Sequence, residues 1–182
     1  MRAGLEPHEL GRFEAILLPH LDAAYTLARY LMRNEHDAQD VVQDAYLRAL
    51  KYFDSFRGAE GGDARGWLLA IVRNTAFTSR RRYRVEASAA EFDEELHSEA
   101  VADVHPEAVL MGTAARETLH QALDQLAPEF REVIVLRELQ GLSYKEIGDV
   151  TGVPVGTVMS RLSRARHRLQ RALGADQERR LR

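Results

Sequence analysis

Apolar residues recur every three or four positions along most of the chain, which is the spacing of one buried helix face. In the first block this pattern is carried by Leu10, Phe13, Ile16, Leu17, Leu21, Ala24, Tyr25, Ala28 and Leu31. A polar break at 34–37 follows, and Asp37 is a suitable cap for a further helix over 38–53. The expected inner side of that helix consists of Val42, Ala45, Ala49 and Phe53.

Glycine and proline divide the rest of the chain. Residues 54–64 contain three glycines and predict a loop, after which Trp67 restarts a helix that ends in an arginine cluster. Farther along, one helix is predicted to stop before Pro128 and another to run from about 129 to 139, where Gly141 ends it. No stretch alternates apolar and polar residues for long, so we expect an all-α protein of two helical bundles.

Charge is distributed unevenly over the 182 residues, although the net charge is only -3. Residues 85–112 hold eight acidic residues and no basic one, with few large apolar side chains, which predicts an acidic flexible linker. Residues 65–84 hold six arginines without an acid, and residues 155–171 hold five. Two such positive stripes indicate contact with phosphates, against the simpler interpretation as solvated helix faces. The linker could likewise shield these stripes or serve only as a spacer.

Several function classes are not expected. The chain has no cysteine, so it offers no disulfide, thiolate nucleophile or cysteine zinc site. Neither a membrane-length apolar run nor a secretory signal is apparent, and we expect a cytoplasmic protein without membrane insertion. His36, Asp40 and Asp44 have a spacing that could ligate a metal ion, but no second cluster or phosphate-binding glycine loop accompanies them. We therefore expect no catalytic residues, no metal and no cofactor.

The strongest local pattern lies in residues 142–169. Ser143 and Glu146 have the spacing of a capping box, and Gly152 stands where the chain must turn before Pro154. In the helix after the turn, the side chains predicted to face the core are Val155, Val158 and Leu162. Those predicted to face outward are Arg161, Arg164, Arg166 and Arg168. Two short helices with an arginine-rich second member are typical of a helix-turn-helix, whose second helix enters the major groove. An ordinary helical hairpin with a basic face is the alternative.

Three segments in this order resemble the extracytoplasmic-function group of bacterial RNA polymerase sigma factors: DAQDVVQDAYLRALKYF (37–53), GWLLAIVRNTAFTSRRRYR (66–84) and the helix-turn-helix. The resemblance covers roughly 10–84 and 113–173. It implies the following division: sigma domain 2 over 1–84, the linker over 85–112, sigma domain 4 over 113–175 and a tail over 176–182. It also implies a protein that binds core RNA polymerase and directs promoter-specific initiation, contacts duplex and melted promoter DNA, and is held inactive by an anti-sigma factor.

The resemblance implies three groups of site residues. Core polymerase would be bound by Asp40, Gln43, Asp44 and Arg48. The minus-ten element would be bound by Phe56, Arg73, Asn74, Thr78, Arg80, Arg81 and Arg82, and the loop from Phe56 to Asp63 would take up an unstacked base. The minus-thirty-five element would be bound by Thr157, Ser160, Arg161, Arg164, Arg166 and Arg168. Of these, Arg161 and Arg164 are expected at bases and Arg166 and Arg168 at phosphates. Many relatives carry Asp or Asn where this chain has Thr78, which leaves the promoter preference open.

A different class of protein shares part of this pattern. A stand-alone helix-turn-helix regulator with an N-terminal helical sensing or dimerisation domain would also explain residues 142–169, but not residues 37–84. It would bind a palindromic operator as a dimer, with half-sites about one helical turn apart. A sigma factor would instead recognise two dissimilar elements and depend on polymerase.

Overall fold

The computed structural model describes residues 7–56, 63–90 and 110–180, and all regular elements in these ranges are helical. The first block contains α1 (Pro7–Leu17), the 3-10 turn η1 (Leu18–His20), α2 (Leu21–Met32), α3 (Glu35–Lys51), the 3-10 turn η2 (Phe53–Ser55) and α4 (Ala64–Ala90). The second block contains α5 (Leu110–Asp124), α6 (Pro128–Ile134), the π-helical turn η4 (Val135–Leu139), α7 (Tyr144–Thr151) and α8 (Val155–Arg180). The all-α prediction is confirmed.

The core of the first block lies between α2, α3 and α4, and large aliphatic side chains such as Leu27, Leu31 and Leu68 are fully buried there. The inner side predicted for the helix over 38–53 is confirmed, because all four of its residues are buried. Two apolar positions of the earlier pattern were predicted wrongly. Leu10 and Leu21 are each 43% exposed, and Leu21 is the first residue of α2, at the turn from α1.

The N-cap of α3 lies three residues earlier than predicted. Arg33 ends α2 in the left-handed conformation, with φ of 67°. Asn34 then caps α3, and its side-chain oxygen accepts hydrogen bonds from the backbone N–H groups of His36 (2.8 Å) and Asp37 (3.3 Å). Asp37 is therefore not the cap but lies in the first turn, where its charge favours the helix N-terminus.

Helices extend into both ends of 85–112, the range predicted to be the linker. α4 continues to Ala90 and α5 begins at Leu110, so both ends of that range are helical. The alanine-rich sequence at 86–90 favours helix, which explains the difference at the first end. The acidic stretch 91–109 and the glycine-rich stretch 57–62, for which a linker and a base-binding loop were predicted, lie outside the described residues.

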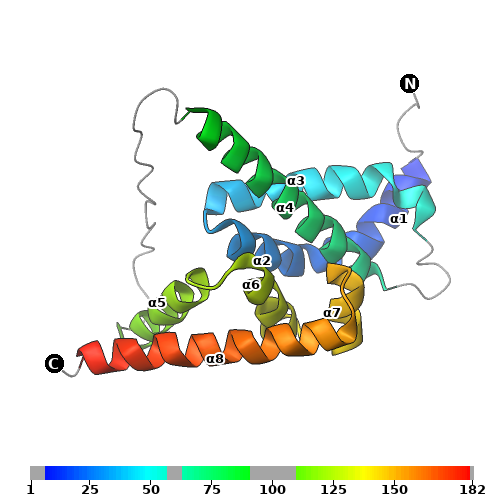
Figure 1. Cartoon of the computed structure of the whole chain (residues 1–182). Coiled ribbons are helices and arrows are strands. Elements are labelled where there is room, and N and C mark those ends of the chain that lie inside the picture. The colour runs from blue at the N-terminus through cyan, green and yellow to red at the C-terminus, as the bar shows by residue number, and fades with distance from the viewer. Residues whose placement is uncertain (1–6, 57–62, 91–109, 181–182) are drawn as a thin grey trace.

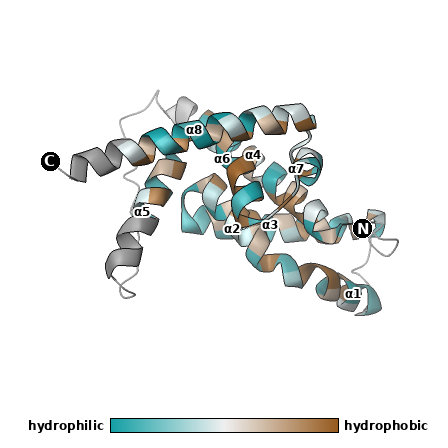
Figure 2. Cartoon of the chain, turned by 90° about the horizontal axis from the view of Figure 1, so that it is seen from below, coloured by the Kyte–Doolittle hydropathy of each residue, from teal (hydrophilic) through white to brown (hydrophobic). Residues whose placement is uncertain are grey.

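The two blocks contact each other in this structure. α6 and α7 lie between α2–α4 on one side and the long helix α8 on the other (Figure 1). Figure 2 looks onto α8 and shows many hydrophilic residues along it, with hydrophobic residues more frequent in the helices behind. The described helices include none that is long and apolar enough to cross a membrane.

Candidate nucleic-acid interface

The helix-turn-helix prediction is confirmed at the level of local structure. Ser143 accepts a hydrogen bond from the backbone N–H of Glu146, whose carboxylate accepts one from Ser143 N–H in return, so the capping box is complete. Gly152 ends α7 with φ of 71°. Gly148 lets the turn come close, because a Cβ there would lie 3.0 Å from the carbonyl oxygen of Val153. α7 is thereby held against α8 at a fixed angle.

The exposed side of α8 carries most of the residues predicted to contact the minus-thirty-five element. Ser160, Arg164, Arg166 and Arg168 are exposed and Thr157 is half-buried. Arg166 donates to Glu138 at 2.7 Å, and this hydrogen bond raises its pKa. The Arg168 guanidinium lies 4.4 Å from the ring centre of Phe130. Arg164 precedes Arg166 by two positions, and its side chain is exposed.

Two orientations on α8 were predicted wrongly. Arg161 turns inward, and its Nη1 lies 3.2 Å from a carboxylate oxygen of Glu132. Val155 was expected inside but is 42% exposed, and Met159 one turn later is 54% exposed. The first turns of α8 therefore present an apolar surface beside the small polar residues.

Glu132 connects the two blocks. Its side chain is fully buried, and the guanidinium of Arg73 on α4 donates to both carboxylate oxygens, with Nε at 2.8 Å and Nη2 at 3.3 Å. Arg161 donates from the other side. Burial raises the pKa of Glu132, an effect that the hydrogen bond from Arg73 opposes. We call these three residues the Glu132 clasp. Arg73, predicted to contact the minus-ten element, is thus held by the second block.

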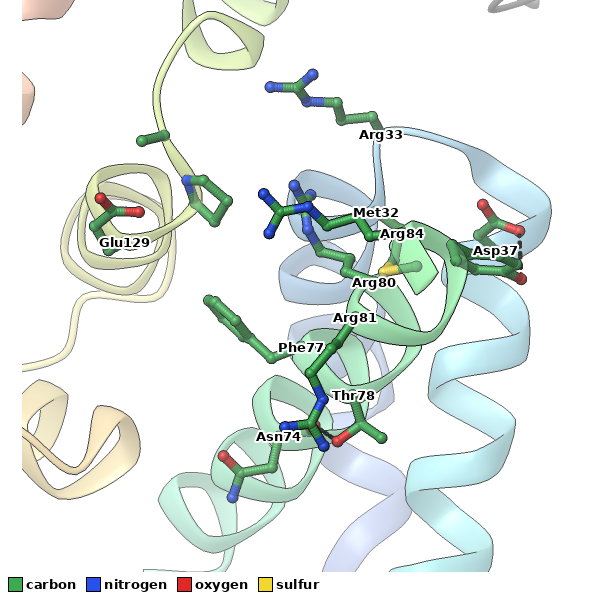
Figure 3. Close-up of a pocket in the computed structure, with 13 residues that line it drawn as sticks. Met32, Arg33, Asp37, Asn74, Phe77, Thr78, Arg80, Arg81, Arg84 and Glu129 are labelled. Carbon is green, nitrogen blue, oxygen red and sulfur yellow. Dashed lines mark hydrogen bonds between the residues drawn. The ribbon is translucent and has the colours of Figure 1, made fainter. Parts of the chain in front are cut away.

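A large cavity of about 1050 Å³ opens beside α4 (Figure 3). Arg33, Arg80 and Arg84 reach into it from α2 and α4, and Glu129 at the start of α6 lies on its other side. Burial, with Arg33 and Arg84 nearby, lowers the pKa of Arg80. Arg33 and Arg80 donate to the backbone oxygens of Asp124 and Leu31, and the positive charge gathered here makes the cavity suited to phosphates.

The other residues predicted for the minus-ten element lie around this cavity or away from it. Asn74, Thr78 and Arg81 line the cavity and Arg82 is exposed. Phe56 differs, because it is only 8% exposed and its ring packs against that of Trp67 in a tilted arrangement, with 4.7 Å between ring centres and 31° between planes. The structure therefore favours a core role for Phe56 over base stacking, and Trp67 packs against the same cluster.

The four residues predicted to bind core polymerase lie together on the exposed side of α3: Asp40, Gln43, Asp44 and Arg48. Beside them an apolar groove of about 650 Å³ runs between α3 and the turn from α1 to α2. The groove was not predicted, although Leu18 (49% exposed), Leu21 (43%) and Leu47 (61%) line it. Leu47 was the available signal, because it follows Gln43 by four positions and Asp44 by three and so lies on the face predicted to bind polymerase. The described residues contain no group of three or more His, Asp or Glu placed to hold a metal ion.

Further polar contacts cross between the blocks. Arg65 donates to the backbone and side-chain oxygens of Gln140 at 2.7 and 2.6 Å. Arg33 donates to the backbone oxygen of Asp124. The rings of Tyr30 and His120 are stacked, with 5.1 Å between centres and 5° between planes. Sequence periodicity could not reveal these pairs, because each joins residues from separate bundles.

Acidification is expected to weaken the Tyr30–His120 stack. Burial lowers the pKa of His120 below its usual 6.5, with Arg29 acting in the same direction and Asp124 against it. The neutral ring is therefore favoured in the folded protein, and its contribution to stability is complete above pH 6.5 and lost as the pH falls through the folded pKa. Urea midpoints between pH 7.5 and 5 measure this loss. His120→Phe should remove that part of the pH dependence, and an unchanged profile in this variant would contradict the assignment.

Comparison with known proteins identifies the family. The family model for sigma-70 region 2 matches residues 16–86, and the model for sigma-70 region 4 matches residues 116–172. The chain is 35% identical to RNA polymerase sigma-H factor of Pseudomonas aeruginosa, with 88% of this chain and 86% of the relative covered. It is 32% identical to ECF RNA polymerase sigma factor SigW of Bacillus subtilis, with 88% of each covered.

Another relative is longer. The chain is 36% identical to ECF RNA polymerase sigma factor SigE of Mycolicibacterium smegmatis over 87% of this chain, but it spans only 60% of that protein. Among solved structures, the sigma factor RpoE in complex with the anti-sigma factor NepR from Bartonella quintana has a TM-score of 0.72. That comparison covers 91% of this chain and 98% of the other, at 32% identity. CnrH in complex with the cytosolic domain of CnrY has a TM-score of 0.64 at 28% identity and covers 90% of this chain and 88% of the other.

Proposed function

The chain belongs to the extracytoplasmic-function group of RNA polymerase sigma factors, and on that basis we propose how its two blocks share the work of binding core polymerase and directing promoter-specific initiation. The first block, 1–84, binds polymerase and the minus-ten element. The second block, 113–175, binds the minus-thirty-five element, and 85–112 joins them. The observation that carries this division is the pair of separate basic surfaces, one on α4 and one on α8.

At the minus-ten element, the arginine-lined cavity beside α4 supplies the positive charge. The residues that bind the DNA phosphates are Arg80, Arg81 and Arg82. Asn74 and Thr78 on the adjacent turns are the polar groups within reach of bases. Arg73 joins them only after it leaves Glu132, because both of its donating edges are occupied in this arrangement. The start of α6 borders the same cavity, so promoter binding by this face requires the second block to move away.

At the minus-thirty-five element, α8 enters the major groove with its N-terminal turns. Ser160 and Arg164 are exposed and face bases, while Arg166 and Arg168, also exposed, reach phosphates. Arg161 acts through the clasp with Glu132 and positions α8 rather than reading a base.

The exposed face of α3 is the polymerase-binding surface. Its mixed charge lies beside the apolar groove, and a polar rim next to an apolar centre is typical of a protein interface. A further proposed partner is an anti-sigma factor, because the two similar solved structures are complexes with a second protein, which in the RpoE structure is an anti-sigma factor. In this proposal the protein acts in the cytoplasm and carries no catalytic centre, metal or cofactor of its own.

Run-off transcription tests the proposed function. Core polymerase from a bacterium is incubated with and without the chain on a pool of promoter fragments, and the transcripts are sequenced. A sigma factor selects a subset of promoters with two dissimilar elements and does so only when polymerase is present. If the chain alone protects a palindromic duplex and leaves polymerase unchanged, the stand-alone regulator is correct instead.

Charge reversal on α3 should separate polymerase binding from folding. We expect the Asp40→Lys, Asp44→Lys double variant to bind core polymerase at least about tenfold more weakly, because like charges replace complementary ones at the interface. Binding is measured by fluorescence anisotropy of a labelled chain titrated with core polymerase. Glu14→Lys, on the exposed side of α1, is the matched control and should bind as wild type does. Equal losses in both proteins would contradict the assignment of this face.

A further inference from the structure

The N-terminal turns of α8 carry two large apolar side chains on the surface, although α8 as a whole is rich in arginine. Val155 is 42% exposed and Met159 is 54% exposed. They are four positions apart and so lie on one side of the helix, one turn above the other. Leaving two such side chains in water is unfavourable unless a partner covers them.

The position of Met159 identifies the kind of partner. The side of α8 that packs on α7 is occupied by Val158, Leu162 and Ala165, which are all buried. Met159 therefore belongs to the outer surface, directly before Ser160 and five residues before Arg164, both exposed. In a helix-turn-helix this part of the second helix is the part that meets base edges.

The chemistry of the major groove indicates which group on the DNA Met159 contacts. The major groove presents donors and acceptors on all four bases, but only thymine offers an apolar group there, its 5-methyl. A methionine thioether has neither a charge nor a donor, and it is flexible enough to pack on such a methyl group. We propose that Met159, with Val155 beside it, recognises the 5-methyl group of a thymine in the minus-thirty-five element. This inference rests on the proposed function.

The same geometry limits what Met159 can read. It cannot distinguish guanine, adenine or cytosine by hydrogen bonding, so selectivity at its position comes from the methyl group alone. Ser160 and Arg164 supply hydrogen bonds to neighbouring base pairs. The element should thus contain at least one thymine at which removal of a methyl group is felt.

Deoxyuridine tests this proposal, because it is thymine without the 5-methyl group. The preferred minus-thirty-five element is first determined by transcription from a randomised library with core polymerase and the full chain. Each thymine of that element, on either strand, is then replaced by deoxyuridine one at a time, and initiation is measured at subsaturating holoenzyme. We expect a loss of about fourfold at one or two positions, which is the effect of burying one methyl group.

Variants assign the effect to the side chain. Met159→Ala should initiate less well on the thymine promoter and lose the sensitivity to deoxyuridine, whereas Met159→Leu should retain it. Leu139→Ala is the matched control, because Leu139 is a similarly exposed apolar residue (48%) of the same block outside α8. Circular dichroism confirms that each variant is folded.

The outcomes are distinct. A methyl effect present in the wild type and Met159→Leu but absent in Met159→Ala supports the proposal. An element without thymine, no methyl effect at any thymine, or an equal effect in Met159→Ala overturns it while promoter-specific transcription still shows a sigma factor. Absence of any polymerase-dependent transcription would overturn the proposed function itself, and this inference with it.

Discussion

Replacing Arg131 by methionine should lower the free energy of unfolding by about 3–5 kcal/mol, because it removes a buried charge-assisted donor from several carbonyl groups. The Arg131 side chain is fully buried. Its guanidinium donates to the backbone oxygens of Leu123 (2.8 Å), Asp124 (2.7 Å) and Leu126 (2.9 Å), and to that of Tyr30 in the first block (2.9 Å). Methionine fills much of the volume but satisfies none of these acceptors.

The cost of burying this charged side chain is reflected in its lowered pKa. Burial, with Arg33 and Arg80 nearby, lowers the pKa of Arg131 to about 10, although Asp124 acts in the opposite direction. The hydrogen bonds must therefore outweigh a substantial desolvation penalty. Losing them removes a donor from four carbonyl groups, of which those of Leu123 and Asp124 keep another. Arg131→Lys should recover less than half of the loss, because an ammonium group cannot reproduce the fork of the guanidinium.

Urea unfolding of the full chain, followed by circular dichroism, measures this effect. Arg164→Met is the matched control, since Arg164 is exposed, and it should change stability by no more than about 0.5 kcal/mol. An Arg131→Met midpoint equal to that of the control would show that the buried hydrogen bonds contribute no net stability.

Local features of the fold could be predicted because they depend on neighbouring residues. The capping box at Ser143 and the left-handed turn at Gly152 each follow from a few adjacent positions, and both are confirmed. The N-cap of α3 was predicted wrongly, because Asn34 and Asp37 are both suitable N-cap residues. Only the path of the backbone selects between them.

Features that join distant segments could not be predicted from spacing. A helical wheel places Arg161 beside Val158 and Leu162, but nothing in that pattern reveals a carboxylate on another helix. A signal did exist in the sequence at Arg131 and Glu132, two charged residues between Phe130 and the apolar run that follows. Adjacent charges inside an apolar segment indicate buried partners, and both side chains are fully buried.

Removing Arg73 from the Glu132 clasp should lower the free energy of unfolding more than removing the charge of Glu132, because the carboxylate is buried. Arg73→Met leaves the buried carboxylate with Arg161 as its remaining guanidinium partner, and we expect a loss of about 2–3 kcal/mol. Glu132→Gln removes the charge, keeps the shape and leaves two arginines whose side chains are 20% and 25% exposed and can be hydrated. That single variant should cost no more than about 1 kcal/mol.

The decisive comparison is the double variant. Glu132→Gln should stabilise the Arg73→Met chain by about 1.5 kcal/mol, because it removes the charge that has lost its partner. The exposed pair Arg166–Glu138, 2.7 Å apart with side chains 46% and 50% exposed, is the matched control. Arg166→Met, Glu138→Gln and their combination should all remain within about 1 kcal/mol of wild type. Simple additivity at Arg73 and Glu132 would contradict the clasp.

The pH dependence of the same variants separates charge from shape. Because burial raises the folded-state pKa of Glu132 above 4.5, its contribution to stability is fully present below that pH and is lost as the pH rises through the folded value. Removal of Arg73 takes away the hydrogen bond that lowers this pKa, so the pKa of Glu132 rises further and the loss of stability extends to higher pH. Arg73→Met should therefore approach wild-type stability as the pH falls toward 4.5, whereas the double variant, which has no carboxyl group at this position, should show no such recovery. A constant difference between Arg73→Met and wild type across this range would mean that lost packing against Phe77, 4.5 Å from the Arg73 guanidinium, and not the buried charge, sets the cost.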